Sequence, residues 1–285
     1  MPLRRRIEKA LPKLASWLLV GFALLVLFGP VLLLALFSFN DSSIISLPWE
    51  GFTTKWYSAA FSNGDATTAI VNSLEVATIV MVVSVVLGTL AAWGLTRLRF
   101  RGKSLLAGVH GAVLVVPWLI IGVAGLIFFS QIPWELSLTT ITLMHIVTTF
   151  PLVVAVVSAG LIRFRPSLEE AAIDMGASQL QMLRYVVLPQ IAPSLAAAAI
   201  FAFAWSFNNF EISFFTGGFE QTFPVWVFSV LRHSPHLPIV NAASTVIAAA
   251  QVLLVFALWQ TMKLMNRRRG GGDSDLAEIM TGAVR

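Results

Sequence analysis

The sequence predicts an all-α membrane protein with six transmembrane helices. Of its 285 residues, 57% are hydrophobic and only 12% are charged. The mean hydropathy of +0.83 lies well above the range of water-soluble domains. Apolar runs long enough to cross a bilayer core, which takes about 20 helical residues, recur along the chain. The chain has no cysteine, so disulfides and thiolate metal sites are excluded.

The first three spans lie in the N-terminal half. We expect span one at about 14–37, because no charged residue occurs between Lys13 and Asp41. The basic residues before it resemble the start of a signal peptide, but the apolar run is too long and lacks a small-residue cleavage site, so it should stay in the membrane. The polar segment after it carries aromatic residues suited to a membrane interface: Trp49, Trp56 and Tyr57. Spans two and three are expected at about 69–95 and 105–129.

The second half continues this alternation of apolar and polar runs. Spans four, five and six are expected at about 138–162, 194–215 and 241–262, with a polar segment at 163–193 between spans four and five. Pro117 and Pro151 fall inside spans three and four, where proline frees a carbonyl and kinks a helix. Residues 1–262 would thus form one transmembrane domain, and the glycine-rich, charged residues 263–285 a flexible cytoplasmic tail.

The distribution of basic residues predicts the orientation. Of the 19 Lys and Arg residues, 17 fall in the N-terminus, the 96–104 turn, the 163–193 segment and the tail, and only Lys55 and Arg232 lie on the other side. The positive-inside rule therefore places both termini and the 163–193 segment in the cytoplasm. Arg97, Arg99 and Arg101 are interpreted as orientation anchors. This pattern explains the net charge of +5 without nucleic acid as a partner.

The polar segment 163–193 is predicted to form two short helices. Capping boxes are expected at both helix starts, from the pairs Ser167–Glu170 and Ser178–Gln181. Gly176 between them can take the left-handed conformation that closes a helix, and Pro189 is expected to end the second helix. The first helix carries acidic residues on one side, and its small or apolar residues would leave a low face that another protein could approach closely: Ala171, Ala172 and Met175.

The same segment carries a spaced signature. Glu170-Ala171-Ala172 is followed after three residues by Gly176, after nine more by Val186, and then by Leu188-Pro189. This spacing resembles the EAA signature of permease subunits of ABC importers, in which the first helix of the loop sits in a cleft on a cytoplasmic ATPase. The resemblance implies the type I importer permease fold and an ATPase-coupling role for Glu170, Ala171, Ala172, Asp174, Gly176, Leu188 and Pro189. The alternative is an amphipathic helix pair that lies on the membrane surface.

No motif for catalysis is found in the chain. A phosphate loop needs Gly, four residues, then Gly-Lys-Ser/Thr, and the candidate Gly102-Lys103-Ser104 has Arg97 where the first glycine should be. The four histidines have no metalloprotease spacing, so no catalytic residue and no metal ligand are predicted. ATP and Mg²⁺ would be used by a separate ATPase, and no cofactor is expected in this chain.

Ionisable groups inside spans are costly and mark candidate solute pathways. Glu75 in span two and Glu211 in span five are such groups. On one helix, Glu211 would share a face with Asn208 and Trp205, and Asn209 lies beside them. A carboxylate, an amide and an aromatic ring are what a desolvated ammonium group needs. The alternatives are that Glu211 is solvated by water near the outer interface and that Glu75 forms hydrogen bonds between neighbouring helices.

Further stretches narrow the resemblance. FSFNDS from Phe37, WEGFTTKWYSAAF from Trp49, NSLEVA from Asn72 and TFPVWVFSVLR from Thr222 resemble the second permease of spermidine/putrescine importers. This resemblance implies a bacterial inner-membrane complex with a sister permease, two ATPase subunits, an extracytoplasmic substrate-binding protein and surrounding lipid. Where an acidic pair would be expected in span five, the chain has Asn208 and Asn209. Open alternatives are a permease for another solute, a self-contained secondary transporter and a membrane scaffold.

Overall fold

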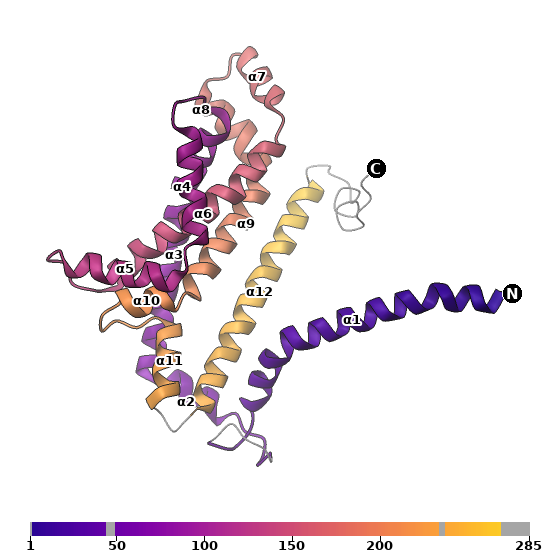
Figure 1. Ribbon diagram of the computed structural model, residues 1–285, viewed down its shortest axis with the longest axis vertical. Helices are drawn as coiled ribbons and strands as arrows, with labels where there is room; N and C mark the ends of the chain where they lie inside the picture. Colours follow the sequence, from indigo (N-terminus) through magenta and orange to yellow (C-terminus); the bar gives the residue numbers. More distant parts are fainter. Residues whose placement is uncertain (1, 44–48, 234–236, 269–285) are drawn as a thin grey trace. The chain divides into compact units, whose positions relative to one another are not determined.

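The computed structural model describes residues 2–43, 49–233 and 237–268, and these residues are helical apart from connecting turns and one isolated antiparallel bridge between Asn40 and Phe52 (Figure 1). The chain divides into two units, residues 1–64 with 229–249 and residues 65–228 with 250–285.

The described residues form twelve α-helices and one π-helical turn. In chain order they are α1 (Pro2–Phe37), α2 (Lys55–Ser62), α3 (Gly64–Arg97), α4 (Lys103–Val115), α5 (Trp118–Ser130), α6 (Leu138–Arg163), α7 (Pro166–Asp174), α8 (Gln179–Met182), a π-helical turn (Leu183–Val187), α9 (Leu188–Phe207), α10 (Glu211–Thr216), α11 (Phe223–His233) and α12 (Pro238–Arg268). Within the described residues, five stretches of helix are long and apolar enough to cross a membrane, and the bent pair α4–α5 makes a sixth if it is one span. The predicted all-α membrane class is confirmed.

In the first unit, the described residues between α1 and α2 contact one another and α2. Asn40 and Phe52 form the antiparallel bridge, and the Trp56 indole donates to the Asn40 carbonyl at 2.8 Å. Trp56 is buried, and the hydroxyls of Tyr57 and Ser38 lie 2.6 Å apart. The ring and the donor of Trp56 are therefore both used inside the protein, and its place in an interfacial belt stays a prediction.

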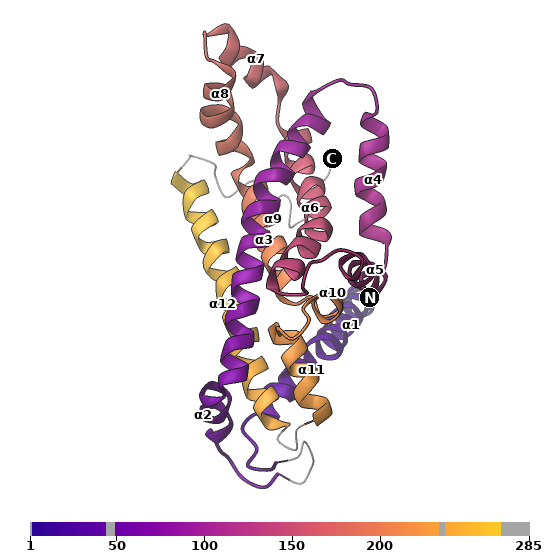
Figure 2. The same cartoon turned by 90° about the vertical axis from the view of Figure 1, so that its left-hand side faces the viewer.

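The second unit is organised around α3, α6 and α9, which lie side by side, with α7 and α8 at one end (Figures 1 and 2). Close approach of these helices depends on glycine. A Cβ on Gly88 of α3 would lie 2.6 Å from Val153 Cγ1 on α6, and a Cβ on Gly160 of α6 would collide with Ser194 on α9. The core between the helices includes Ala92, Val157, Leu161, Ala198 and Ala202.

Span three is not one continuous helix, contrary to the prediction for 105–129. Its two halves, α4 and α5, are bent by 103° at Val116 and Pro117. Proline disfavours helical backbone in the residue before it, and Val116 accordingly takes an extended conformation (φ −68°, ψ 128°). The sequence predicted a kink at Pro117, but the structure has a full break.

Span five also differs from the predicted 194–215. Its helix includes Pro193, ends at Phe207, and is followed by a break before α10. The break arises because asparagine side chains compete with the helix for backbone groups. The Asn209 side chain accepts from the Ile212 N–H at 3.0 Å and so starts α10 as a cap. The helix α10 packs on α5, where a Cβ on Gly122 would lie 3.0 Å from the Glu211 carbonyl oxygen.

Candidate functional site

The turn between α7 and α8 is closed by hydrogen bonds on both sides of Gly176. Gly176 has φ +88°, its N–H donates to Ile173 at 2.8 Å, and the Ala177 N–H donates to Ala172 at 3.0 Å. These two bonds form a Schellman motif, which uses up the last carbonyls of α7. Beyond it, Ser178 and Gln181 make the predicted capping box. The predicted left-handed conformation of Gly176 at the end of α7 and the second capping box are confirmed.

The first predicted capping box, from Ser167 and Glu170, is absent. The helix α7 begins at Pro166, with Arg165 in the capping position. Proline favours the first helical position, because its φ is already helical and its missing N–H would be unpaired there in any case. Ser167 is thereby moved inside the first turn, where it cannot cap.

The residues of α7 divide between two faces. Glu170, Ala171 and Asp174 are exposed, whereas Ala172 is buried in the core of the unit. Large apolar side chains join the exposed face, and Met175 is 84% exposed. The expectation that Ala172 contributes to an accessible face is wrong, because it packs inward with Phe164, Met182 and Val187. The helix thus has one face held by its own chain and one face that no described residue covers.

Pro189 does not end the second helix as predicted. α8, the π-helical turn and α9 form one continuous apolar helix from Gln179 to Phe207. Proline removes one helical hydrogen bond and crowds the preceding turn, and a widened π turn directly before it accommodates both effects. Leu188 and Val186 pack against the core cluster. The last part of the signature therefore lies inside the bundle rather than on an exposed loop.

Arg97 is more than an orientation anchor. Its guanidinium contacts Glu169 Oε1 through both Nε and NH2, each at 2.7 Å, so it joins the end of α3 to α7. Its neighbours Arg99 and Arg101 are exposed. Sequence reasoning missed this contact because the positive-inside rule already accounted for all the basic residues of the turn.

The break between α9 and α10 brings together three of the predicted pathway residues. Trp205 makes an edge-on contact with Trp118, with ring centres 4.4 Å apart. Asn208 is exposed, donates to the Ala204 carbonyl at 2.8 Å and accepts from the Gln251 amide at 3.4 Å. Asn209 is 1% exposed. Its Nδ2 and the Trp205 Nε1 are buried donors without an acceptor among the described residues.

The two acidic candidates occupy different environments. Glu211 is the first residue of α10 and is half-buried. The predicted shared helical face of Trp205, Asn208 and Glu211 is wrong, because the chain breaks between the second and third of them. Glu75 lies on an exposed side of α3, while its neighbour Val76 is buried with Val80.

A buried histidine, missed as a functional residue by the sequence analysis, connects the two sides of this break. His145 on α6 is 1% exposed, with Nδ1 2.9 Å from Ser206 Oγ on α9 and Nε2 3.1 Å from Ser213 Oγ on α10. The available signal was an ionisable residue in the middle of an apolar span, which is itself a functional indicator.

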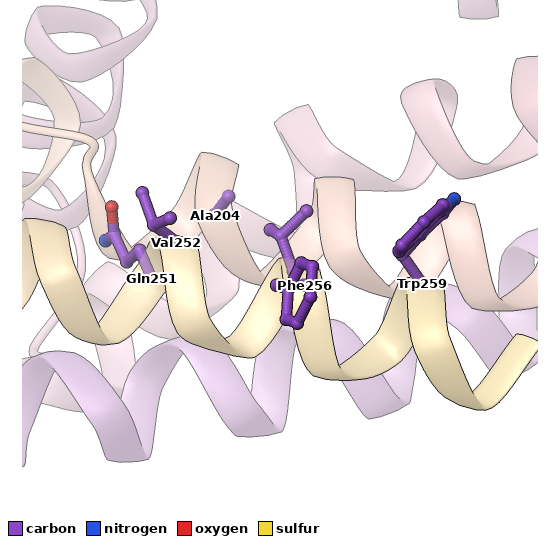
Figure 3. Close-up of a pocket in the computed structure, with 6 residues that line it drawn as sticks. Ala204, Gln251, Val252, Phe256 and Trp259 are labelled. Carbon is purple, nitrogen blue, oxygen red and sulfur yellow. The ribbon is translucent and has the colours of Figure 1, made fainter.

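A groove of about 550 Å³ lies beside the break, between α9 and the second half of α12. Figure 3 shows its lining side chains along α12, with Ala204 facing them from α9. The lining is apolar except for Gln251, which is also the residue that reaches Asn208. The groove therefore offers apolar contact with a single amide at the polar end.

The comparisons with known proteins define the class. Residues 84–269 match the family described as "Binding-protein-dependent transport system inner membrane component", and the chain belongs to this family. It is therefore a multi-pass inner-membrane protein, a non-catalytic permease subunit of an ABC importer that works with a binding protein. A self-contained secondary transporter is not favoured.

The chain is similar to individual transport proteins of known sequence or structure. The chain is 33% identical over 260 residues to the putrescine transport system permease protein PotI of Escherichia coli strain K12, covering 88% of this chain and 91% of that protein. It is 32% identical to the spermidine/putrescine transport system permease protein PotC of Shigella flexneri, covering 87% and 93%. A chain of a bacterial ABC transporter for alginate import shares the fold, with a TM-score of 0.72, 17% identity and coverage of 94% and 99%. The predicted importer permease fold is confirmed.

Proposed function

We propose that this subunit forms half of a translocation pathway for a polyamine or a related cationic amine. The observation that supports it most strongly is the similarity over almost the whole chain to permeases named for putrescine and for spermidine with putrescine. In the proposed complex, a sister permease supplies the other half of the pathway. An extracytoplasmic binding protein delivers the amine, and two ATPase subunits use ATP and Mg²⁺.

The α9–α10 break has the side-chain chemistry for contact with the solute in such a pathway. A polyamine alternates ammonium groups with short methylene stems, so it needs carboxylate or amide oxygens beside apolar or aromatic walls. Glu211, Asn208 and the Trp205 ring provide these groups at the break. Because Asn209 is buried and caps α10, we assign it to holding the break rather than to contact with the solute. Glu75 on α3 would contact the amine at another point of the path.

The exposed face of α7 is proposed as the contact with an ATPase. Glu170, Ala171 and Asp174 give it a charged and low surface, and Leu168, Ile173 and Met175 add apolar area. Exposed apolar residues grouped with polar ones are typical of protein contact sites. Because the distribution of basic residues predicts a cytoplasmic position for both termini and this helix, the ATPase would bind there.

The decisive test is ATP-driven uptake of labelled putrescine and spermidine by the complete complex in liposomes. Glu211→Gln keeps the size of the side chain and removes its charge, so we expect at least about a tenfold loss, the size of one charge-assisted hydrogen bond. Glu135→Gln is the matched control, because Glu135 is exposed on the α5–α6 connection. Unchanged uptake by Glu211→Gln in an assembled complex would exclude the pathway role of Glu211.

A second measurement tests the α7 contact. Glu170→Arg reverses a charge on the exposed face without touching the core, so the permease should fold and the ATPase should no longer co-purify with it. Retention of the ATPase at the wild-type level would show that it binds elsewhere.

A further inference from the structure

The ion pair between Arg97 and Glu169 joins three separate segments of the second unit. Arg97 is in the last turn of α3, and Glu169 is in the first turn of α7. Besides contacting Glu169, the Arg97 NH2 donates to the Leu161 carbonyl at 3.0 Å and to the Phe164 carbonyl at 3.4 Å, at the end of α6. One side chain thus connects α3, the C-terminus of α6 and α7.

The burial of this pair distinguishes it from an ordinary surface contact. The Arg97 side chain is 17% exposed and the Glu169 side chain 12%. The guanidinium lies about 6 Å from the rings of Trp93 and Phe164. Surface ion pairs contribute little, whereas a shielded arginine with several acceptors is held in one geometry. A cation at the end of α6 also complements the partial negative charge of that helix terminus.

Adjacent residues of the same type do not share this arrangement. Arg99 is exposed, and Lys103 donates to the Leu98 carbonyl within its own turn. Orientation in the membrane requires basic charge in this turn but does not require one arginine to be buried against an acid on α7. The environments of Glu169 and Glu170 also differ, because the Glu169 carboxylate contacts Arg97 whereas Glu170 is exposed.

The chain itself connects α7 to membrane helices on both sides, to α6 through Phe164 and Arg165 and to the continuous helix that ends at Phe207 through the Gly176 turn and α8. The Arg97–Glu169 pair adds a connection between side chains, and this connection leads to α3. We propose that Arg97 is a positioning residue that transmits the displacement of α7 to α3, as a second coupling route in parallel with the covalent one. This inference rests on the proposed role of α7 in ATPase contact.

The test is a double-mutant cycle on the reconstituted complex, with the number of amine molecules imported per ATP hydrolysed as the readout. Arg97→Ala and Glu169→Ala should each lower this ratio about three- to tenfold, the range expected for residues that carry coupling between sites. Because both residues act through one contact, the double variant should be no worse than either single variant. Arg99→Ala, the matched control in the same turn, should leave the ratio unchanged.

A merely structural role predicts different results. If the pair is only structural, the alanine variants should lower the amount or thermal stability of the complex, while the complexes that do form keep the wild-type ratio of amine imported per ATP hydrolysed. That outcome would overturn the inference. A double variant whose loss is the product of the two single losses would overturn it as well. If the alanine variants do not assemble, Glu169→Gln, which keeps an acceptor oxygen and removes the charge, should lower the ratio in the same direction, and an unchanged ratio would overturn the inference.

Failure of the underlying function gives a distinct result. If the wild-type chain binds no ATPase, α7 has no coupling role and the proposed function itself fails. If the wild-type complex couples normally and Arg97→Ala couples equally well, only the second route is refuted.

Discussion

The hydrogen bonds of His145 lead to an ordered prediction about its two serine partners. Ser213 Oγ lies 2.9 Å from the Asn209 carbonyl oxygen and 3.1 Å from His145 Nε2. A carbonyl only accepts, so the single hydroxyl hydrogen of Ser213 is used there, and Nε2 must be the donor to Ser213. A neutral imidazole that donates through Nε2 accepts through Nδ1, so Ser206 donates to it at 2.9 Å.

The two serines should therefore contribute unequally to stability. Ser213→Ala removes two hydrogen bonds and leaves the N–H of His145 buried without an acceptor, which should cost about 2–3 kcal/mol. Ser206→Ala removes one neutral hydrogen bond and leaves the Nδ1 of His145 without a donor, and it should cost about 1–2 kcal/mol. For a chain of this size, each kcal/mol corresponds to a change of about 2 °C in the unfolding temperature. We expect losses of about 4–6 °C for Ser213→Ala and about 2–4 °C for Ser206→Ala.

Thermal unfolding of the purified subunit or complex in detergent, followed by tryptophan fluorescence, measures this difference. Ser130→Ala is the control, because Ser130 is exposed and its hydroxyl bonds only to the carbonyl of Ile127. It should change the midpoint by less than about 1 °C. If Ser206→Ala destabilises the protein as much as Ser213→Ala or more, the assigned donor and acceptor roles of the imidazole are wrong.

Three further tests, two of them with a matched control, concern the close approaches and turns. Gly88→Ala would place a Cβ 2.6 Å from a valine of α6 and should cost about 1–3 kcal/mol in thermal unfolding. Gly94→Ala, whose Cβ meets only the side chain of Leu98 at 4.0 Å, should be neutral or slightly stabilising. Gly176 and Gly102 both have φ near +88° and open space around them, so Gly176→Ala and Gly102→Ala should cost about 1–2 kcal/mol each. Only Gly176→Ala should lower ATP-driven uptake. Equal uptake by both variants would contradict the role of the Gly176 turn. Asn209→Ala removes the cap of α10 and should cost about 0.5–2 kcal/mol in the same unfolding assay, and a smaller loss would show that the cap is not what starts α10.

The class and the approximate spans were predictable because they depend on properties that a single sequence carries. Length of apolar runs and clustering of basic residues are local, and the bilayer makes them decisive. The Gly176 turn was predictable for the same reason, since its glycine and the Ser178–Gln181 box lie within a few residues of each other. Such features need no knowledge of what packs against them.

The errors concern features that depend on tertiary neighbours. Ala172 and Ala171 look alike in sequence, and only the packing of α7 shows that the first is buried. Span five was predicted as one helix because its apolar run is nearly continuous, while the side chain of Asn209, which caps α10, decides where it breaks. Arg97 was misassigned because a sufficient local explanation for its charge existed, and its partner lies 72 positions away.

The positions of these features along one helix suggest how the two halves of the proposed mechanism are joined. The Schellman turn and capping box at Gly176 and Ser178 leave few unpaired backbone groups, so α7 and α8 are connected by a turn of defined geometry. From α8 the helix continues without a loop to Phe207, directly before the α9–α10 break. Ser206, one residue before that end, is the residue that His145 holds. A displacement of α7 would thus be carried along this helix to Ser206 and its contact with His145, and for this reason we expect substitutions there to alter coupling as well as stability.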